Sequence, residues 1–95
     1  MKAVYKFPLM VVKLQRIKMP KNSTILTVQI QGQRVCLWAL VDIDKGLEDR
    51  FFAIFETGKQ VPENILRYVG TFQIPEENFV GHVFEMKGED ELQLA

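Results

Sequence analysis

The sequence predicts an all-β fold: a single small antiparallel β-sandwich or partly open barrel of about six strands. The alternative is a β-rich α+β domain with one short helical turn. Three observations support this prediction. Apolar and polar residues alternate at a period of two in several segments, these segments begin about every 8–12 residues, and Gly, Pro, Asn or Asp residues separate them. The length of 95 residues suits one compact domain.

The first 20 residues, "MKAVYKFPLMVVKLQRIKMP", predict one or two edge strands. Pro8 has no backbone N–H, so it cannot donate a hydrogen bond within a central ladder and suits an edge or a bulge. Pro20 is expected to end the element for the same reason.

The segment "STILTVQIQG" is the clearest strand, because Leu26, Val28 and Ile30 alternate with polar residues and should share one face. A glycine-containing turn follows, so this strand and "RVCLWALVD" read as a hairpin. The second strand lacks polar alternation, which is typical of a strand that is buried on both faces. We therefore expect it at the centre of a sheet.

A polar, acidic segment, "DIDKGLEDR", predicts a loop with exposed carboxylates. The strand "FFAIFETG" follows it and should place Phe51, Ala53 and Phe55 on one face. The acids of the loop do not match the ligand spacing of a calcium-binding EF-hand.

A short helical turn and two more strands complete the predicted domain. Pro62 in "KQVPENILR" suits the first position of a helical turn. Turn-forming residues separate "RYVGTFQI" from the last strand, "FVGHVFEM". The alternation in the first of these strands predicts one face formed by Tyr68, Gly70, Phe72 and Ile74. We expect residues 1–87 to form one β-rich domain and residues 88–95 to form a flexible acidic C-terminal tail.

Basic and acidic residues are unevenly distributed along the chain. Residues 1–41 contain seven basic side chains and no acidic one, whereas residues 42–95 contain five basic and twelve acidic side chains. A shared basic face would attract an anionic partner. Strands of the two halves could instead pair and place opposite charges across from each other. We favour this second arrangement.

No membrane segment, disulfide or metal site is expected. The chain has no apolar run of the roughly 18–20 residues that cross a bilayer, and no signal-peptide cleavage pattern, so we expect a cytoplasmic protein. One cysteine and one histidine cannot form an internal disulfide or a structural zinc site. No Gly-rich nucleotide fingerprint is present, and no cofactor is expected.

No catalytic residues are predicted, and we expect that the protein is not an enzyme. His82 and Glu85 are three residues apart on a strand, so they should lie on opposite faces. We expect His82 to be a structural side chain bonded to a backbone group. Cys36 lies within an apolar run and shares a face with Trp38, which predicts a packing role for the thiol.

Seven short sequence words, in order, resemble a family of small uncharacterised proteins of tailed phages and their prophages. The words lie between Tyr5 and Glu85. They are "YKFPL", "IKMP", "ILTVQIQ", "CLWALVD", "ETGK", "YVGTFQ" and "HVFE". The resemblance implies a compact β-rich phage accessory protein without an assigned activity or site. Ile43–Gly46 stand where the family pattern has a proline-containing loop, so nothing is carried over for that loop.

The leading functional hypothesis is a protein-interaction or inhibitory module. An exposed edge strand or apolar patch would dock onto a host or phage protein, in the cytoplasm of the bacterial host. A homodimer is compatible with this hypothesis, because it would bury surface that a short chain leaves exposed.

The alternative is a small-ligand protein that sequesters a nucleotide signal of host defence. Arginines would bind phosphate and aromatic rings would stack on a base. The candidate ligand-binding residues are Tyr5, Arg16, Arg34, Trp38, Arg50, Arg67 and Tyr68. Binding of single-stranded nucleic acid is a third hypothesis and is disfavoured by the net charge of zero and the pI of 6.6.

Overall fold

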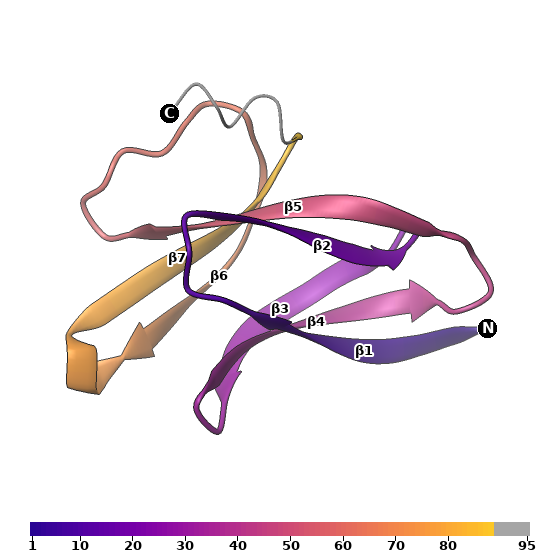
Figure 1. The fold of residues 1–95 in the computed structure, drawn as a ribbon, viewed down its shortest axis with the longest axis horizontal. Helices are drawn as coiled ribbons and strands as arrows, with labels where there is room; N and C mark the ends of the chain where they lie inside the picture. Colours follow the sequence, from indigo (N-terminus) through magenta and orange to yellow (C-terminus); the bar gives the residue numbers. More distant parts are fainter. Residues whose placement is uncertain (89–95) are drawn as a thin grey trace.

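A computed structural model describes residues 1–88 and shows an all-β fold, as predicted. The strands are β1 (Lys2–Leu9), β2 (Leu14–Pro20), β3 (Thr24–Gln31), β4 (Arg34–Asp42), β5 (Leu47–Glu56), β6 (Ile65–Ile74) and β7 (Phe79–Met86), and a 3-10 turn, η1, covers Pro75–Glu77 (Figure 1). The described part of the chain thus has seven strands where about six were expected. The predicted tail, apart from Gly88, lies outside the described residues.

The strands form two antiparallel sheets that pack as a sandwich. One sheet has the strand order β1-β4-β3 and the other has the order β2-β5-β7-β6. We call them the three-stranded and four-stranded sheets; the inner face of each is the face toward the other sheet. The predicted hairpin is formed by β3 and β4, and β4 lies at the centre of the three-stranded sheet, as expected.

The N-terminal segment forms two edge strands, one in each sheet. Among the described strands, β1 pairs only with β4, and β2 pairs only with β5. Residues 10–13 connect these two strands, so the chain crosses from one sheet to the other within four residues. Both expected proline positions are edge positions, since Pro8 lies in β1 and Pro20 ends β2.

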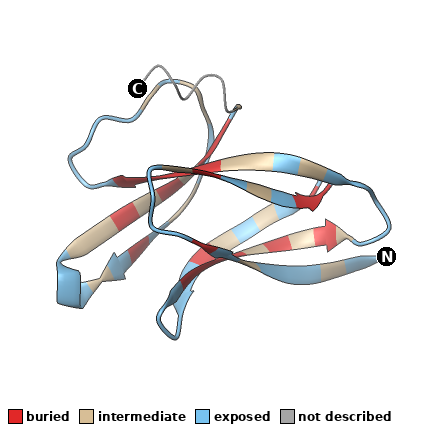
Figure 2. Cartoon of the chain, in the orientation of Figure 1, coloured by how far each residue is buried: buried red, intermediate tan, exposed pale blue. Residues whose placement is uncertain are grey.

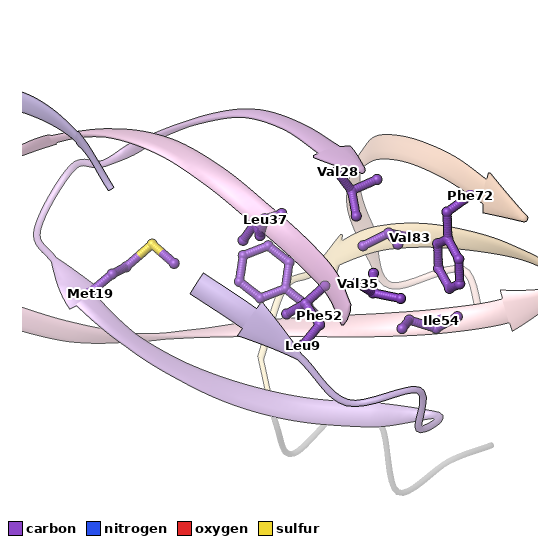
Figure 3. Close-up of a cluster of buried hydrophobic side chains, with 9 residues drawn as sticks. All are labelled: Leu9, Met19, Val28, Val35, Leu37, Phe52, Ile54, Phe72 and Val83. Carbon is purple, nitrogen blue, oxygen red and sulfur yellow. The ribbon is translucent and has the colours of Figure 1, made fainter. Parts of the chain in front are cut away.

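The hydrophobic core lies between the two inner faces. It contains Leu9, Met19, Val28, Val35, Leu37, Phe52, Ile54, Phe72 and Val83 (Figure 3). Burial is concentrated in the central strands, whereas β1 is exposed over most of its length (Figure 2). Met19, Leu37, Phe52 and Val83 are fully buried.

The two sheets approach each other most closely where β3 meets β6. A Cβ atom at Gly70 would lie 2.7 Å from Cγ1 of Val28, so any larger residue would force the Val28 side chain to move. The opposite side, between β1 and β2, is more open. Tyr5 lies on the inner face of β1, opposite Ala39, and yet 43% of its surface is exposed.

A second apolar cluster lies on the outer face of the four-stranded sheet. Phe51, Ala53 and Phe55 share this face, as the sequence predicted, while Phe52 and Ile54 point into the core. The rings of Phe55 and Phe84 meet edge to face with centroids 6.1 Å apart.

Two local predictions are wrong. Residues 47–50 were expected in a loop but belong to β5, because they pair with β2; Lys18 lies opposite Asp49, for example. The segment "KQVPENILR" contains no helical turn before β6 begins at Ile65. The helical turn of the described residues is η1, where Pro75 occupies the first turn.

Bulges change which side chains share a face in two strands. In β6 the register shifts between Tyr68 and Gly70, so Tyr68 lies on the outer face opposite Phe84, while Phe72 is buried in the core. The alternation had predicted that Tyr68 and Phe72 share a face. The bulge places them on opposite faces, so this prediction is wrong. A shift between Ile25 and Thr27 likewise leaves Leu26 48% exposed rather than beside Val28.

Candidate functional site

The edge strand β1 carries backbone groups that do not bond to β4. The N–H of Ile43 donates a hydrogen bond to the carbonyl oxygen of Met1 at 2.9 Å, and the β1–β4 register places these two residues opposite each other. Hydrogen-bonded and non-hydrogen-bonded pairs alternate along an antiparallel ladder. Odd-numbered residues of β1 therefore bond to β4, and even-numbered residues direct their backbone groups away from the sheet.

We call these outward groups of Lys2, Val4, Lys6 and Pro8 the β1 free edge. Pro8 has no N–H, so the free edge offers three donors and four carbonyl acceptors. The outward position of Pro8 explains how a proline fits in this strand, because its nitrogen is not required to donate to β4.

Apolar and aromatic surface accompanies these backbone groups. Val4 is 57% exposed on the outer face, and Tyr5 is exposed on the inner face beside Phe7, with ring centroids 6.5 Å apart. The side chain of Trp38 is half-buried and lies opposite Lys6 on the outer face. An extended segment that paired with β1 would therefore cover apolar surface on both of its sides.

The lysines of β1 are not neutralised by the rest of the described chain. None of the ion pairs among residues 1–88 includes Lys2 or Lys6, and Nζ of Lys6 instead donates to the neutral amide oxygen of Gln31 at 2.6 Å. The predicted charge pairing across strands does occur in β2, where Nζ of Lys18 lies 3.0 Å from a carboxylate oxygen of Asp49. Opposite charges therefore do lie across from each other at Lys18 and Asp49 and at Lys2 and Asp42, but within residues 1–88 Lys2 forms no ion pair.

Asp42 lies opposite Lys2, but its carboxylate is occupied by another cation. The N-terminal ammonium of Met1 donates to Asp42 at 3.1 Å and also bonds to Asp44. These bonds raise the pKa of the ammonium, Asp44 contributing most, and the bond from the ammonium lowers the pKa of Asp42. Lys2 itself forms no ion pair with an acidic side chain of residues 1–88.

The structure places the seven predicted ligand residues in separate regions. Trp38 lies on the outer face of the three-stranded sheet, and Tyr5 lies on the inner face of β1. Arg16 and Tyr68 are on β2 and β6 of the other sheet. Arg34 begins β4, whereas Arg50 bonds near Ser23 at the opposite end of the hairpin. Within residues 1–88, a shared partner brings Arg50 and Arg67 together.

That partner is Glu85, a buried carboxylate that the sequence interpretation missed. Glu85 lies opposite the core residue Phe52 on the inner face, with 2% of its side chain exposed. Arg50 donates to it from Nε and Nη2, and Arg67 approaches it at 3.2 Å. The hydrogen bond to Glu85 raises the pKa of Arg50.

Arg50 is therefore committed to internal bonding. Its remaining nitrogen, Nη1, donates to the carbonyl oxygen of Ser23 at 2.9 Å and lies 3.5 Å from Glu48. Every nitrogen of this guanidinium thus has a partner within the protein. A glutamate in the strand "FVGHVFEM", where His82 is the only other polar side chain, is the one signal in the sequence that could have suggested a buried ion pair.

Arg34 lines a pocket of about 660 Å³ at one end of the sandwich. The β1–β2 connection, the β3–β4 turn and η1 surround this pocket. Buried Leu9 and Val35 contribute apolar surface, while Glu76 and Glu77 supply carboxylates. None of the ion pairs within residues 1–88 includes Arg34.

His82 is held by side-chain hydroxyl groups. Its Nδ1 lies 2.9 Å from Oγ1 of Thr71, and its Nε2 lies 2.7 Å from Oγ1 of Thr57. Tyr68 extends this network through its own hydroxyl, 2.5 Å from Thr71. The prediction that His82 bonds to a backbone group is thus wrong. The prediction that His82 and Glu85 lie on opposite faces of the strand is confirmed.

Cys36 is buried, as predicted, although it lies on the outer face of the three-stranded sheet rather than in the central cluster. Its thiol donates to the carbonyl oxygen of Arg34 at 3.7 Å. Within residues 1–88 no group of three His, Cys, Asp or Glu side chains could hold a metal ion. No helix in the same residues has the length and apolar character needed to cross a bilayer.

Comparison with known proteins gives one match. No curated protein and no solved structure matches the chain. Residues 1–93 match a family described as a domain of unknown function, DUF7352. The match covers nearly the whole chain and agrees with the resemblance to an uncharacterised family. The protein therefore belongs to the family of the domain of unknown function DUF7352.

Proposed function

We propose that this protein is a protein-binding module that takes up an extended segment of its partner along the β1 free edge. The main support for the proposal is the hydrogen-bond pattern of β1: its even-numbered residues leave three N–H and four carbonyl groups facing away from the sheet. Proteins commonly use such edges to add a strand from another chain. Main-chain hydrogen bonds supply affinity in this mode, and alternate side chains supply specificity.

Charge selects the kind of segment that would bind. Lysine and proline on an edge strand oppose indiscriminate pairing of strands. Two copies of β1 paired antiparallel about Val4 would place Lys2 of each copy opposite Lys6 of the other, and like charges in that position are destabilising. An acidic segment of another protein would instead complement both lysines. A homodimer through this edge is accordingly disfavoured.

The resemblance to small tailed-phage proteins suggests the class of partner. A phage accessory protein of this size would meet host or phage proteins in the bacterial cytoplasm, and occupation of a partner's extended segment would inhibit or redirect that partner. We therefore propose a host or phage protein with an accessible extended segment as the target.

A proline substitution tests the proposal without removing a hydrogen bond of the fold. Val4→Pro deletes one outward N–H and leaves the bonds between β1 and β4 in place. The matched control is Lys18→Pro, because the N–H of Ile54 bonds to the carbonyl of Lys13 and fixes even-numbered residues of β2 as outward. Both variants should retain a folded-state NMR spectrum.

Tagged protein and both variants would be used to capture partners from lysates of infected and uninfected bacterial cells. The proposal predicts that a stoichiometric partner is lost with Val4→Pro and retained with Lys18→Pro. Equal capture by both variants would show that β1 is not the binding edge. Capture that is lost equally with both variants would also overturn the proposal.

A small-ligand trap is the second candidate, and the pocket beside Arg34 favours it. Its volume of about 660 Å³ is within the range of small-molecule sites, and Arg34 could bind an anionic group. A nucleotide at 100 times its Kd would stabilise the folded protein by about 2.7 kcal/mol. A melting-temperature shift that Arg34→Gln abolishes would support this candidate. A broad nucleotide panel without any shift would reject it.

A further inference from the structure

We infer that the segment added to β1 is five residues long and has an acidic residue at each end of a three-residue apolar core: acidic, apolar, apolar, apolar, acidic. This inference rests on the proposed function of the β1 free edge and names the chemistry of its partner. The acids would lie opposite Lys2 and Lys6, and the central apolar residue would lie opposite Val4.

The spacing follows from the backbone phase of β1. Lys2, Val4 and Lys6 direct their N–H and carbonyl groups outward, and their side chains lie together on the outer face. In an added strand, the residues opposite them are also two apart and share that face. The two acids are thus four residues apart, a distance of about 13 Å along a strand.

The acids at the ends follow from the electrostatics around the two lysines. The titratable group opposite Lys2 on β4 is Asp42, whose carboxylate is bonded to the ammonium of Met1. Lys6 lies opposite Trp38 and bonds to the neutral Gln31. An incoming carboxylate would therefore meet two cations that no acidic side chain of residues 1–88 neutralises.

The apolar core follows from the surface on the two sides of β1. Val4 is 57% exposed on the outer face, so the residue opposite it would bury apolar area. The intervening positions of the added strand would face inward, beside Ala3 and Tyr5. The ring of Tyr5 is exposed at the open side of the sandwich and offers a packing surface to an apolar side chain.

A polypeptide fits this edge better than a polynucleotide. Both carry negative charge, but only a polypeptide can satisfy alternating N–H and carbonyl groups along the strand. The apolar positions between the two lysines also favour side chains over phosphates. Stronger binding of an oligonucleotide than of an acidic peptide at β1 would overturn the inference.

The test is an NMR titration of the full chain with three short peptides. The first has a core of Glu-Tyr-Val-Val-Glu, the second replaces both glutamates by glutamine, and the third replaces them by lysine. We expect the first peptide to shift the amide signals of Lys2, Val4 and Lys6. The glutamine peptide should bind roughly 2- to 30-fold more weakly, as two lost cross-strand charge pairs imply.

A charge exchange supplies the matched control. The variant Lys2→Glu/Lys6→Glu should no longer bind the glutamate peptide and should bind the lysine peptide instead. The control variant Lys13→Glu/Lys21→Glu changes two lysines outside β1 and should bind each peptide with the affinity of the natural chain. Equal affinity for the glutamate and glutamine peptides at β1 would overturn the acidic pattern and leave the edge function standing.

Three other results would overturn the inference. Peptide-induced shifts confined to other strands would place binding elsewhere and would count against the proposed function as well. Stronger shifts of Lys2 and Lys6 with an oligothymidine than with the glutamate peptide would indicate a nucleic-acid ligand. Concentration-dependent shifts of Val4 without any peptide would indicate that a second copy occupies the edge.

Discussion

Replacement of Glu85 by glutamine tests how much of the fold depends on the buried ion pair. The carboxylate is 2% exposed, and the side chain of Arg50, its principal partner, is 12% exposed. Glutamine preserves the shape but removes the charge, so Arg50 would remain buried without its principal counterion and would keep only Glu48, at 3.5 Å from Nη1. Loss of one partner from a buried pair costs about 3–5 kcal/mol. Small domains have only about 5–15 kcal/mol of total stability.

The assay is equilibrium unfolding in urea at neutral pH, followed by tryptophan fluorescence. Glu85→Gln should lower the free energy of unfolding by about 3–5 kcal/mol with an unchanged m-value. The matched control is Arg67→Gln, because 52% of the Arg67 side chain is exposed and Glu85 would keep its two bonds from Arg50, so the cost should lie near the roughly 1 kcal/mol of a solvent-exposed pair. If Glu85→Gln were no more destabilising than Arg67→Gln, the assignment of Glu85 as an essential buried partner would be refuted.

A double substitution separates the loss of charge from the loss of packing. Arg50→Met/Glu85→Met replaces the pair by apolar side chains and should be more stable than Glu85→Met alone, since no guanidinium remains buried without its principal partner. A double variant that is less stable than the single one would show that the arginine stabilises the fold mainly through other contacts, such as its bond to Ser23.

Two further predictions concern packing and pH. Gly81→Ala should lower the free energy of unfolding by about 1–3 kcal/mol in the urea assay, because a Cβ atom there would lie 2.6 Å from the ring of Phe72. Gly46→Ala is the control and should be nearly neutral, since the atom nearest to a Cβ there lies at 3.9 Å. Equal losses of stability in the two variants would contradict the steric argument. The pKa of Asp42 should lie below its ordinary value in an NMR titration and should rise after acetylation of the Met1 amine. The contact of Asp42 with the amine stabilises the fold at pH values above the pKa that Asp42 has in the unfolded chain. This stabilisation disappears as the pH falls through the lower pKa that Asp42 has in the folded protein. An unchanged pKa after acetylation would argue against this contact.

Features that depend on neighbouring residues could be predicted from the sequence. Alternation at a period of two identified most strands, and the apolar run around Trp38 correctly indicated a central strand. The position of Pro8 indicated an edge, because the missing N–H excludes a central ladder. These signals are local, so a single sequence was sufficient to reveal them.

Features that depend on pairing across the fold could not be predicted in the same way. The bulge after Tyr68 moves its ring to the outer face, and no residue type in "RYVGTFQI" marks that shift unambiguously. β5 begins early because Lys18 and its neighbours on β2 provide a pairing partner for an otherwise polar segment. The cluster around Glu85 joins residues of three strands, and the sequence does not show that they meet.

The candidate binding edge was predictable only in part. An exposed edge strand was expected from the prolines, and a basic first half was evident from the charges. The sequence could not show that Lys18 is neutralised by Asp49 while Lys2 and Lys6 have no such partner within residues 1–88. That difference depends on the strand register, and it is what favours β1 over β2.

Amide hydrogen exchange measured residue by residue, with and without the captured partner, tests the central claim most directly. In the free protein the amides of Lys2, Val4 and Lys6 should exchange rapidly, while those of Tyr5 and Phe7 should be protected by their bonds to β4. Addition of the partner should protect the three outward amides. Protection of Val4 and Lys6 in the free protein, or their continued rapid exchange in the complex, would contradict the account.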